Sequence, residues 1–460
     1  MNWTVMKFGG TSLATPERIA HAAGLACAHE GRVAVVVSAG GDTTDCLETA
    51  LGLAARGDRA AALRMVDGLP DISAESGKLL HELRDLLLGV SLLRETSDAT
   101  RDLVLSHGEQ LSVFAMRDAI VACGRKAIAV DARTWLTTDA RFGEARVDQA
   151  ATESGLVAER RRWGDRIPVI TGFVGATGDG RTTTLGRGGS DYSATLLARG
   201  LGASEVQIWT DVPGVMTADP AIVAGARPLG QMSYGEALEL AIFGAKVLHP
   251  RTLVPLLGTS IPMRIKNTQE PSLPGTRVDR AGCSDEELAT SVTSLEDLAL
   301  FDLRIQRLHE GPELGEGLHR SLGAAQCRPW LVTHSGHGQG ISVVVHRRES
   351  DRLRAELERR FVAELARGDL APIHRREPVA LLTVVGEAMG RTPGVAGRLF
   401  GALGASQINV LSIGQSATAR SISCVIDQRE LAAAVQSVHS AFQFASLCRP
   451  RLAAIQRWAG

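Results

Sequence analysis

Apolar runs of strand length alternate with helical patterns through the first three-fifths of the chain. The strand-like runs are short and rich in Val, Ile and Ala: Trp3–Phe8, Val33–Ser38, Lys126–Val130, Pro168–Phe173 and Glu205–Trp209. Apolar positions with helical spacing lie between them, at Thr15–Ala26, Gln110–Ala122 and Ser190–Gly200. Strands separated by helices predict an α/β fold, in which a mostly parallel central sheet is covered by helices.

The pattern changes near Ser272–Gly282, where Pro and Gly residues cluster among polar ones. Such clusters are typical of connections between domains. We therefore expect one domain over residues 1–280 and a second region over residues 281–460. Two α+β units are expected in that region, at about residues 295–375 and 376–450.

The two α+β units share a rough plan. In the first, strands are predicted at Asp297–Gln306 and Gly340–His346. The second is clearer, and its predicted strands and helices are Pro378–Gly386, Val395–Ala405, Ile408–Ile413, Ser421–Ile426 and Arg429–Phe442. A β-α-β-β-α-β order is a common small sandwich, so the region reads as an internal duplication.

Composition narrows the class of protein. The 460 residues are 44% hydrophobic and 22% charged, which is ordinary for a soluble globular protein. The net charge of −1 gives no electrostatic basis for binding nucleic acid or an anionic membrane. No apolar run approaches the roughly 20 residues of a membrane span. The seven cysteines contain no CxxC pair, which argues against a zinc site or a disulfide framework. With no recognisable signal peptide, we expect a cytoplasmic protein with reduced thiols.

Two glycine clusters precede predicted helices. The first is Lys7-Phe8-Gly9-Gly10-Thr11-Ser12 and the second is Leu185-Gly186-Arg187-Gly188-Gly189-Ser190-Asp191. Glycine lets backbone N–H groups approach an anion closely, and a helix N-terminus adds partial positive charge. Neither cluster is a GxxxxGK[ST] phosphate loop. The simpler interpretation is a pair of tight turns, with Ser190 or Asp191 as a helix N-cap.

Two further segments are candidates for ligand contacts. Ser106-His107-Gly108-Glu109 is predicted at the start of a helix, where Glu109 could receive a substrate ammonium or simply complement the helix dipole. His107 is assigned no catalytic role. The run from Trp209 to Met216 leaves a strand through a Pro-Gly turn, a position that suits a nucleotide contact or a plain connection.

The lysines support phosphoryl transfer. Only five of the 50 basic residues are lysine: Lys7, Lys78, Lys126, Lys246 and Lys266. Transfer of a phosphoryl group requires positioning and neutralisation of charge more than covalent help from the protein. Lys7 and Lys246, together with Mg²⁺, would supply that neutralisation, with Asp191 orienting Lys7.

The motifs together resemble the aspartate kinases of the amino-acid kinase family. The similar segments are KFGGTS at Lys7–Ser12, SAGGDTTD at Ser38–Asp45, SHGEQLS at Ser106–Ser112, RTTTLGRGGSDYSA at Arg181–Ala194, WTDVPGVMTADP at Trp209–Pro220 and FGAKVLHPRT at Phe243–Thr252. The last third resembles the paired ACT regulatory region of that family. Its segment Ile408–Ser423 is most similar to the kinase half of bifunctional aspartate kinase–homoserine dehydrogenases.

The resemblance implies specific roles. It makes Lys7, Asp191 and Lys246 the catalytic residues. The residues implied to bind ATP are Lys7, Phe8, Gly9, Gly10, Thr210, Asp211, Met216, Lys246 and Val247. Those implied to bind L-aspartate are Thr44, Glu109, Arg187, Gly188, Gly189 and Ser190, with Arg187 on a carboxylate and Glu109 on the amino group. No residue is assigned as a metal ligand.

The resemblance also implies partners and leaves alternatives open. It implies ATP as co-substrate, Mg²⁺, an amino-acid effector (threonine or lysine) at the ACT units, and a homodimer or higher homo-oligomer. A kinase acting on another amino-acid carboxylate such as glutamate is the first alternative. A regulatory protein with a decayed kinase site is the second, motivated by Ala221 where the family usually has an arginine.

Overall fold

The computed structural model describes residues 3–70, 74–244, 247–282, 290–306, 314–336 and 339–442. The chain forms two compact units, and it passes between them more than once. The first unit comprises Met1–Val215 and Val247–Arg280, and the second comprises Met216–Lys246 and Ala281–Gly460. Each unit is described separately below.

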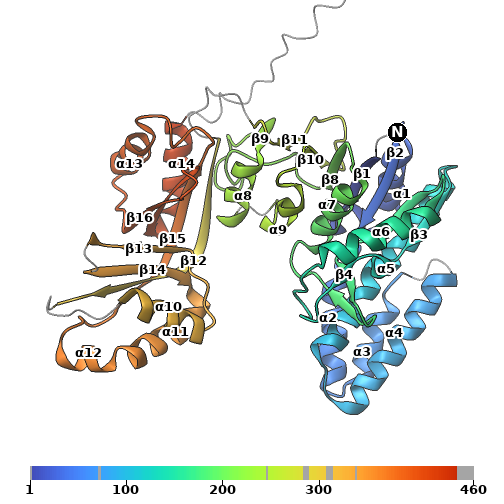
Figure 1. The fold of residues 1–460 in the computed structure, drawn as a ribbon, viewed down its shortest axis with the longest axis horizontal. Coiled ribbons are helices and arrows are strands. Elements are labelled where there is room, and N and C mark those ends of the chain that lie inside the picture. Colours follow the sequence, from blue (N-terminus) through green and yellow to red (C-terminus); the bar gives the residue numbers. More distant parts are fainter. Residues whose placement is uncertain are drawn as a thin grey trace, which may run out of the picture. The chain divides into compact units, whose positions relative to one another are not determined.

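The first unit is built on a mostly parallel sheet, as the alternation of strands and helices predicts (Figure 1). Its strands lie in the order β3-β5-β2-β1-β8-β10-β11. All neighbours are parallel except β10 and β11. The bounds are β1 Trp3–Phe8, β2 Arg32–Val37, β3 Ala127–Val130, β5 Ile167–Thr171, β8 Glu205–Thr210, β10 Met263–Asn267 and β11 Thr276–Asp279.

Helices cover this sheet on both faces. Met6 and Phe8 of β1 pack in one apolar cluster with residues of α1 (Pro16–Cys27) and α5 (Asp98–Ala122). Because side chains alternate along a strand, Val5 and Lys7 point to the other face. There α7 (Gly189–Leu201) packs on β1. This alternation aims Lys7 at α7.

The prediction for α5 is wrong at its N-terminal end. The helix begins at Asp98, three turns earlier than expected, because the Ser97 side chain caps it by accepting a hydrogen bond from Thr100 N–H at 3.1 Å. Ser106–Glu109 therefore lies in the middle of a helix, and Glu109 does not complement a helix N-terminus.

Three helices that the sequence patterns did not resolve precede α5: α2 Thr43–Ala55, α3 Arg59–Asp67 and α4 Ala74–Leu93. The first unit also contains α6 (Gln149–Trp163) and α9 (Pro250–Leu253). A second, small sheet is formed by β4 (Thr137–Thr138), β6 (Val174–Thr177) and β7 (Thr182–Thr184).

The turns that follow β1 and β2 press against one another. Gly41 N–H donates to the Gly10 carbonyl at 2.9 Å. A Cβ atom on Gly10 would lie 2.8 Å from the carbonyl oxygen of Ala39, and one on Gly40 would lie 2.5 Å from that of Leu13. Both contacts are to backbone, which cannot swing aside, so this approach requires glycine.

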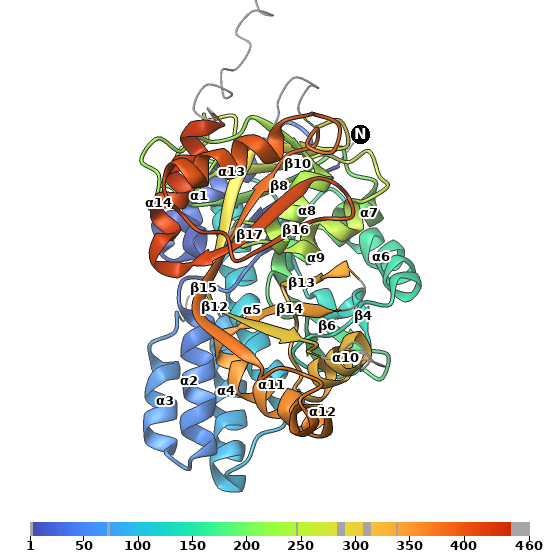
Figure 2. The ribbon, with the colours of Figure 1, turned by 90° about the vertical axis from the view of Figure 1, so that its left-hand side faces the viewer.

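The second unit contains an antiparallel sheet in the order β13-β14-β12-β15-β17-β16 (Figure 2). Its elements are β12 Ser291–Arg304, α10 Leu314–Ala324, β13 Leu331–His334, β14 Gly340–His346, α11 Arg347–Arg360, α12 Val362–Arg367, β15 His374–Val385, α13 Val395–Ala405, β16 Ser412–Gln415, β17 Ser421–Asp427 and α14 Leu431–Ala441. The segment β9 (Gln231–Ser233) and α8 (Tyr234–Ile242) also belong to this unit.

Two α+β repeats share the long strands β12 and β15. Leu298–Arg304 of β12 pairs with β14, whereas Ser291–Leu295 pairs with the end of β15. The start of β15 likewise pairs within the first repeat, and Val379–Val385 pairs with β17. The first repeat ends and the second begins inside β15.

One face of this sheet is covered by α10 and α11 over the first repeat and by α13 and α14 over the second. The other face is buried by curling of the sheet, which brings the edge strands β13 and β16 together at Thr333 and Ser412, whose hydroxyl oxygens are 3.2 Å apart. The strand predicted at Ile408–Ile413 is wrong over most of its length. Ile408 and Val410 pack into the apolar core, and pairing begins only at Ser412.

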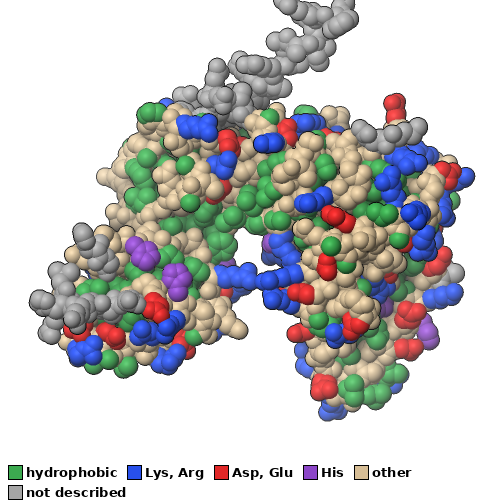
Figure 3. Space-filling view, viewed as in Figure 1, with side chains coloured by type: hydrophobic (Ala, Val, Ile, Leu, Met, Phe, Trp, Pro, Cys, Tyr) green, Lys and Arg blue, Asp and Glu red, His purple; other side chains and the backbone are tan. Residues whose placement is uncertain are grey.

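The surface carries side chains of both charges, as the near-zero net charge of the sequence predicts. Figure 3 shows Lys and Arg side chains together with Asp and Glu side chains over the visible face. Within the described residues, no helix combines the length and apolar character needed to cross a membrane.

The glycine contact between the two turns can be tested with a matched pair of variants. Gly10→Ala should destabilise the protein by about 1–3 kcal/mol, because the added methyl meets backbone. Gly24→Ala, in α1 with no atom within 4 Å of the added Cβ, should instead stabilise it by up to about 1 kcal/mol. Urea unfolding of both full-length variants measures the difference; equal midpoints would contradict the packing.

Candidate active site

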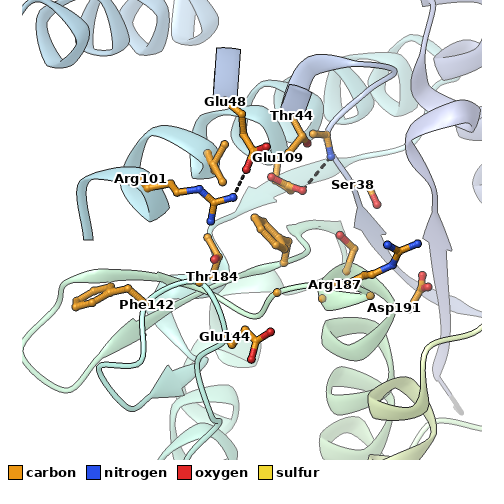
Figure 4. A pocket seen from close by; sticks show the side chains of 18 of the residues that line it. Ser38, Thr44, Glu48, Arg101, Glu109, Phe142, Glu144, Thr184, Arg187 and Asp191 are labelled. Carbon is orange, nitrogen blue, oxygen red and sulfur yellow. Dashed lines mark hydrogen bonds and ion pairs between the residues drawn. The ribbon is translucent and has the colours of Figure 1, made fainter. Parts of the chain in front are cut away.

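A cavity of about 580 Å³ opens in the first unit, beside the carboxyl ends of β1 and β2. Its walls come from β1, the turn after β2, α2, α5 and the glycine-rich segment that leads into α7 (Figure 4). Eight residues predicted to bind substrate or to act in catalysis line it together: Lys7, Thr44, Glu109, Arg187, Gly188, Gly189, Ser190 and Asp191. Lys7 and Arg187 therefore face one cavity.

Lys7 and Asp191 form an ion pair at the base of the cavity. The Lys7 Nζ lies 2.6 Å from Asp191 Oδ1, and both side chains are largely buried. Lys7 is the penultimate residue of strand β1, whereas Asp191 lies in the first turn of α7. The ion pair holds the Lys7 ammonium group at the N-terminus of α7.

The N-cap of α7 is Gly188, so the simpler interpretation with Ser190 or Asp191 as cap is wrong. Gly188 has φ +72° and no side chain with which to cap the helix. A Cβ atom there would lie 2.5 Å from His249 Cβ, which explains the glycine. The first N–H groups of α7 therefore receive no side-chain cap, and such groups favour an anion.

Glu109 projects from the middle of α5 and is 4% exposed. One carboxylate oxygen, Oε1, accepts a hydrogen bond from Ala39 N–H at 3.1 Å. The other, Oε2, is buried without a hydrogen-bond partner among the described residues. Burial raises the pKa of Glu109 to about 8, although the Ala39 N–H and the Lys7 charge lower it. A buried carboxylate with a free oxygen is suited to receive a cation.

Close packing places Glu109 at the cavity. A Cβ atom on the preceding Gly108 would lie 2.8 Å from Ala39 Cβ, so glycine lets α5 approach the turn after β2. His107 points elsewhere. Its Nδ1 lies 2.9 Å from the Leu103 carbonyl oxygen, and the side chain is buried.

Arg187 is exposed and forms no ion pair with any residue that the structure describes. Figure 4 shows its side chain beside Asp191 at the cavity. The unpaired guanidinium of Arg187 can bind a carboxylate through two parallel hydrogen bonds. Thr44, which also lines the cavity, lies in the first turn of α2 and is half-buried.

The residues predicted to bind nucleotide do not line this cavity, apart from Lys7. Gly9 and Thr210 lie at the adjacent carboxyl ends of β1 and β8, where Gly9 N–H donates to the Trp209 carbonyl at 3.1 Å. The Phe8 side chain is buried and stacks on Trp209, so only its backbone can face a ligand. Gly10, Asp211 and Val247 also belong to the first unit, and Met216 belongs to the second. Lys246 lies outside the described residues.

Several residues that line the cavity, or that bond to its lining, were not found from the sequence. Asp102 is fully buried on α5 and accepts hydrogen bonds from Thr184 and Gly143, both of which line the cavity. Burial raises the pKa of its carboxyl group, against the lowering effect of these bonds. Its spacing of seven residues from Glu109, two helical turns, was a usable signal. Arg101 and Glu48 form an ion pair at the same cavity, where Phe142 and Glu144 also lie.

The comparisons with known proteins agree with the motifs. The profile of the Amino acid kinase family matches residues 2–267, and an ACT domain profile matches residues 382–442. A bifunctional aspartokinase/homoserine dehydrogenase of Haemophilus influenzae is 34% identical over 458 residues, which are 95% of this chain and 56% of that protein. The chain thus spans about half the length of the bifunctional relatives.

Two comparisons extend over whole proteins. Lysine-sensitive aspartokinase 3 of Escherichia coli is 31% identical, over 95% of this chain and 98% of that protein. The crystal structure of Escherichia coli aspartokinase III in complex with aspartate and ADP superposes with a TM-score of 0.79 at 28% identity, over 95% of this chain and 99% of that one. The chain belongs to the amino acid kinase family, among its aspartokinases, and carries an ACT domain near its C-terminal end.

Proposed function

We propose that this protein is an aspartate kinase, which transfers the γ-phosphoryl group of ATP to the β-carboxylate of L-aspartate. The observation that carries the proposal is the cavity in which Lys7, Glu109, Arg187 and the start of α7 converge. Aspartate has one ammonium and two carboxylate groups. The cavity offers a buried carboxylate opposite two cationic side chains, which is the complementary set. Family membership and the aspartate bound to the related Escherichia coli enzyme add support.

In the proposed complex, Glu109 Oε2 receives the ammonium of aspartate and Arg187 binds a carboxylate. Thr44 and Ser190 complete the aspartate contacts with Gly188 and Gly189. An oxygen of the β-carboxylate then bonds to the γ-phosphorus of ATP while the bond from that phosphorus to the β,γ-bridging oxygen breaks, releasing ADP. An aspartate side chain is already ionised at neutral pH, with a usual pKa of ~3.9. The reaction therefore needs no general base.

Lys7 neutralises charge on the moving phosphoryl group, and Asp191 fixes its ammonium. The remaining predicted nucleotide contacts stay part of the proposal: Phe8, Gly9, Gly10, Thr210, Asp211, Met216, Lys246 and Val247. Mg²⁺ is expected to enter with ATP, bound to its phosphates.

We further propose that the region from residue 281 onward is regulatory and binds an amino acid. The ACT profile match and the lysine-sensitive relative support this. The homo-oligomer predicted from the sequence stays a prediction.

Lys7→Ala tests the catalytic assignment. Removing a preorganised charge from a phosphoryl-transfer site should lower kcat by at least about 100-fold. Trapping the acyl phosphate as hydroxamate, with aspartate and a glutamate control, measures both rate and substrate choice. Lys126→Ala is the matched control, because that lysine pairs with Asp165 on the surface. Normal hydroxamate formation by Lys7→Ala would refute the role, and a preference for glutamate would refute the substrate.

The pH dependence tests Glu109. With a pKa of about 8, Glu109 is protonated at pH 6–7 and must lose its proton to receive an ammonium. The aspartate KM of the wild type should therefore fall as pH rises from 6 to 8 and level off above. Glu109→Gln should have a higher KM without that slope. Initial rates at saturating ATP measure this, and the same slope in the variant would contradict the assignment.

Regulation can be tested by adding lysine and threonine separately to the aspartate-dependent release of ADP. At least one should lower the rate at millimolar concentration while leaving the protein folded. Alanine serves as the control amino acid. Unchanged rates with both effectors would contradict the regulatory assignment without affecting the catalytic one.

A further inference from the structure

Two charged residues with no assigned role hold the same pair of backbone segments. Asp102, fully buried on α5, uses Oδ2 to accept hydrogen bonds from Thr184 N–H at 2.7 Å and Gly143 N–H at 2.8 Å. Its Oδ1 accepts a third from the Thr184 hydroxyl at 2.8 Å. One carboxylate thus binds the N–H groups of two segments that are 41 residues apart in the chain.

Arg251, half-buried in α9, binds the carbonyl groups of these segments. Its Nη1 donates to the Leu185 carbonyl at 2.6 Å and its Nη2 to the Ala145 carbonyl at 2.9 Å. Its guanidinium also lies over the Tyr192 ring of α7, 5.1 Å from the centroid. Ala145 N–H donates to the Thr184 carbonyl at 3.0 Å, which joins the two segments directly.

The two anchored segments lead directly into the substrate cavity. Thr184 and Leu185 are followed by Gly186, which has φ +73°, and then by Arg187. A Cβ atom on Gly186 would lie 2.9 Å from the Gly143 carbonyl oxygen, so these backbones are in close contact. Since Arg187 has no partner among the described residues, the backbone beneath it sets where its guanidinium can reach.

We propose that Asp102 and Arg251 are positioning residues for aspartate, which together fix the backbone that presents Arg187. The inference rests on the proposed function. An anion that binds N–H groups and a cation that binds C=O groups determine both position and direction of the paired segments. A purely structural role predicts loss of stability alone. A positioning role predicts weaker binding of aspartate with little change for ATP.

The test compares Arg251→Lys, Asp102→Ala and the conservative Asp102→Asn. A lysine ammonium cannot form the planar fork that reaches two carbonyls. Hydrogen bonds to charged groups are worth roughly tenfold or more in affinity. Arg251→Lys and Asp102→Ala should therefore raise the aspartate KM about tenfold, with the ATP KM within about twofold. Asp102→Asn retains one oxygen for the two N–H groups and should recover most of the aspartate affinity.

Arg199→Lys is the matched control, because Arg199 also donates to a backbone carbonyl, that of Pro255 at 3.4 Å, away from the cavity. Its aspartate KM should be unchanged. An unchanged aspartate KM in folded Arg251→Lys, or equal rises for aspartate and ATP, would overturn the inference. If Asp102→Ala does not fold, the same criteria apply to Arg251→Lys alone. A wild-type protein that fails to phosphorylate aspartate would overturn the proposed function itself, whereas an active wild type with unaffected variants overturns the inference alone.

Discussion

The ion pair between Lys7 and Asp191 joins the two elements on which the candidate site depends. Strand β1 contributes the ammonium and α7 contributes the carboxylate, at a distance of 2.6 Å with both side chains largely buried. A charge removed from water is costly unless it is paired, so β1 and α7 must keep this alignment in the folded protein. Gly10 lets the turn after β2 approach the end of β1, and Gly188 leaves room for His249 at the start of α7.

The carboxylate of Glu109, unlike the Lys7–Asp191 pair, is not fully satisfied by the described residues. Its carboxylate is buried, yet one oxygen has no partner among the described residues and its pKa is raised to about 8. In the proposed reaction this cost is recovered when the substrate ammonium arrives. The same first unit therefore contains one charge that is neutralised in advance and one that is held ready for the ligand.

Much of the fold could be predicted because it depends on local patterns. Runs such as Trp3–Phe8 and Val33–Ser38 are buried on both faces, so their apolar character alone identifies strands of a parallel sheet. The start of α5 was missed because its first turns bury polar residues, among them Asp102, Ser106 and Glu109, which interrupt the apolar pattern. Its cap at Ser97 is an ordinary polar residue. The strand at Ile408–Ile413 was misplaced since apolar residues there fill the core without pairing. The cavity residues with glycine or lysine signals were predicted, whereas Asp102 and Arg251 were not, because their partners are backbone groups distant in sequence.

The sharing of β12 and β15 between the two repeats of the second unit limits how that region can be divided. Cutting the chain at the repeat boundary would split a strand and leave both halves with an open edge. The two repeats therefore form a single folded element. Any exchange of one repeat between relatives would have to transfer both together.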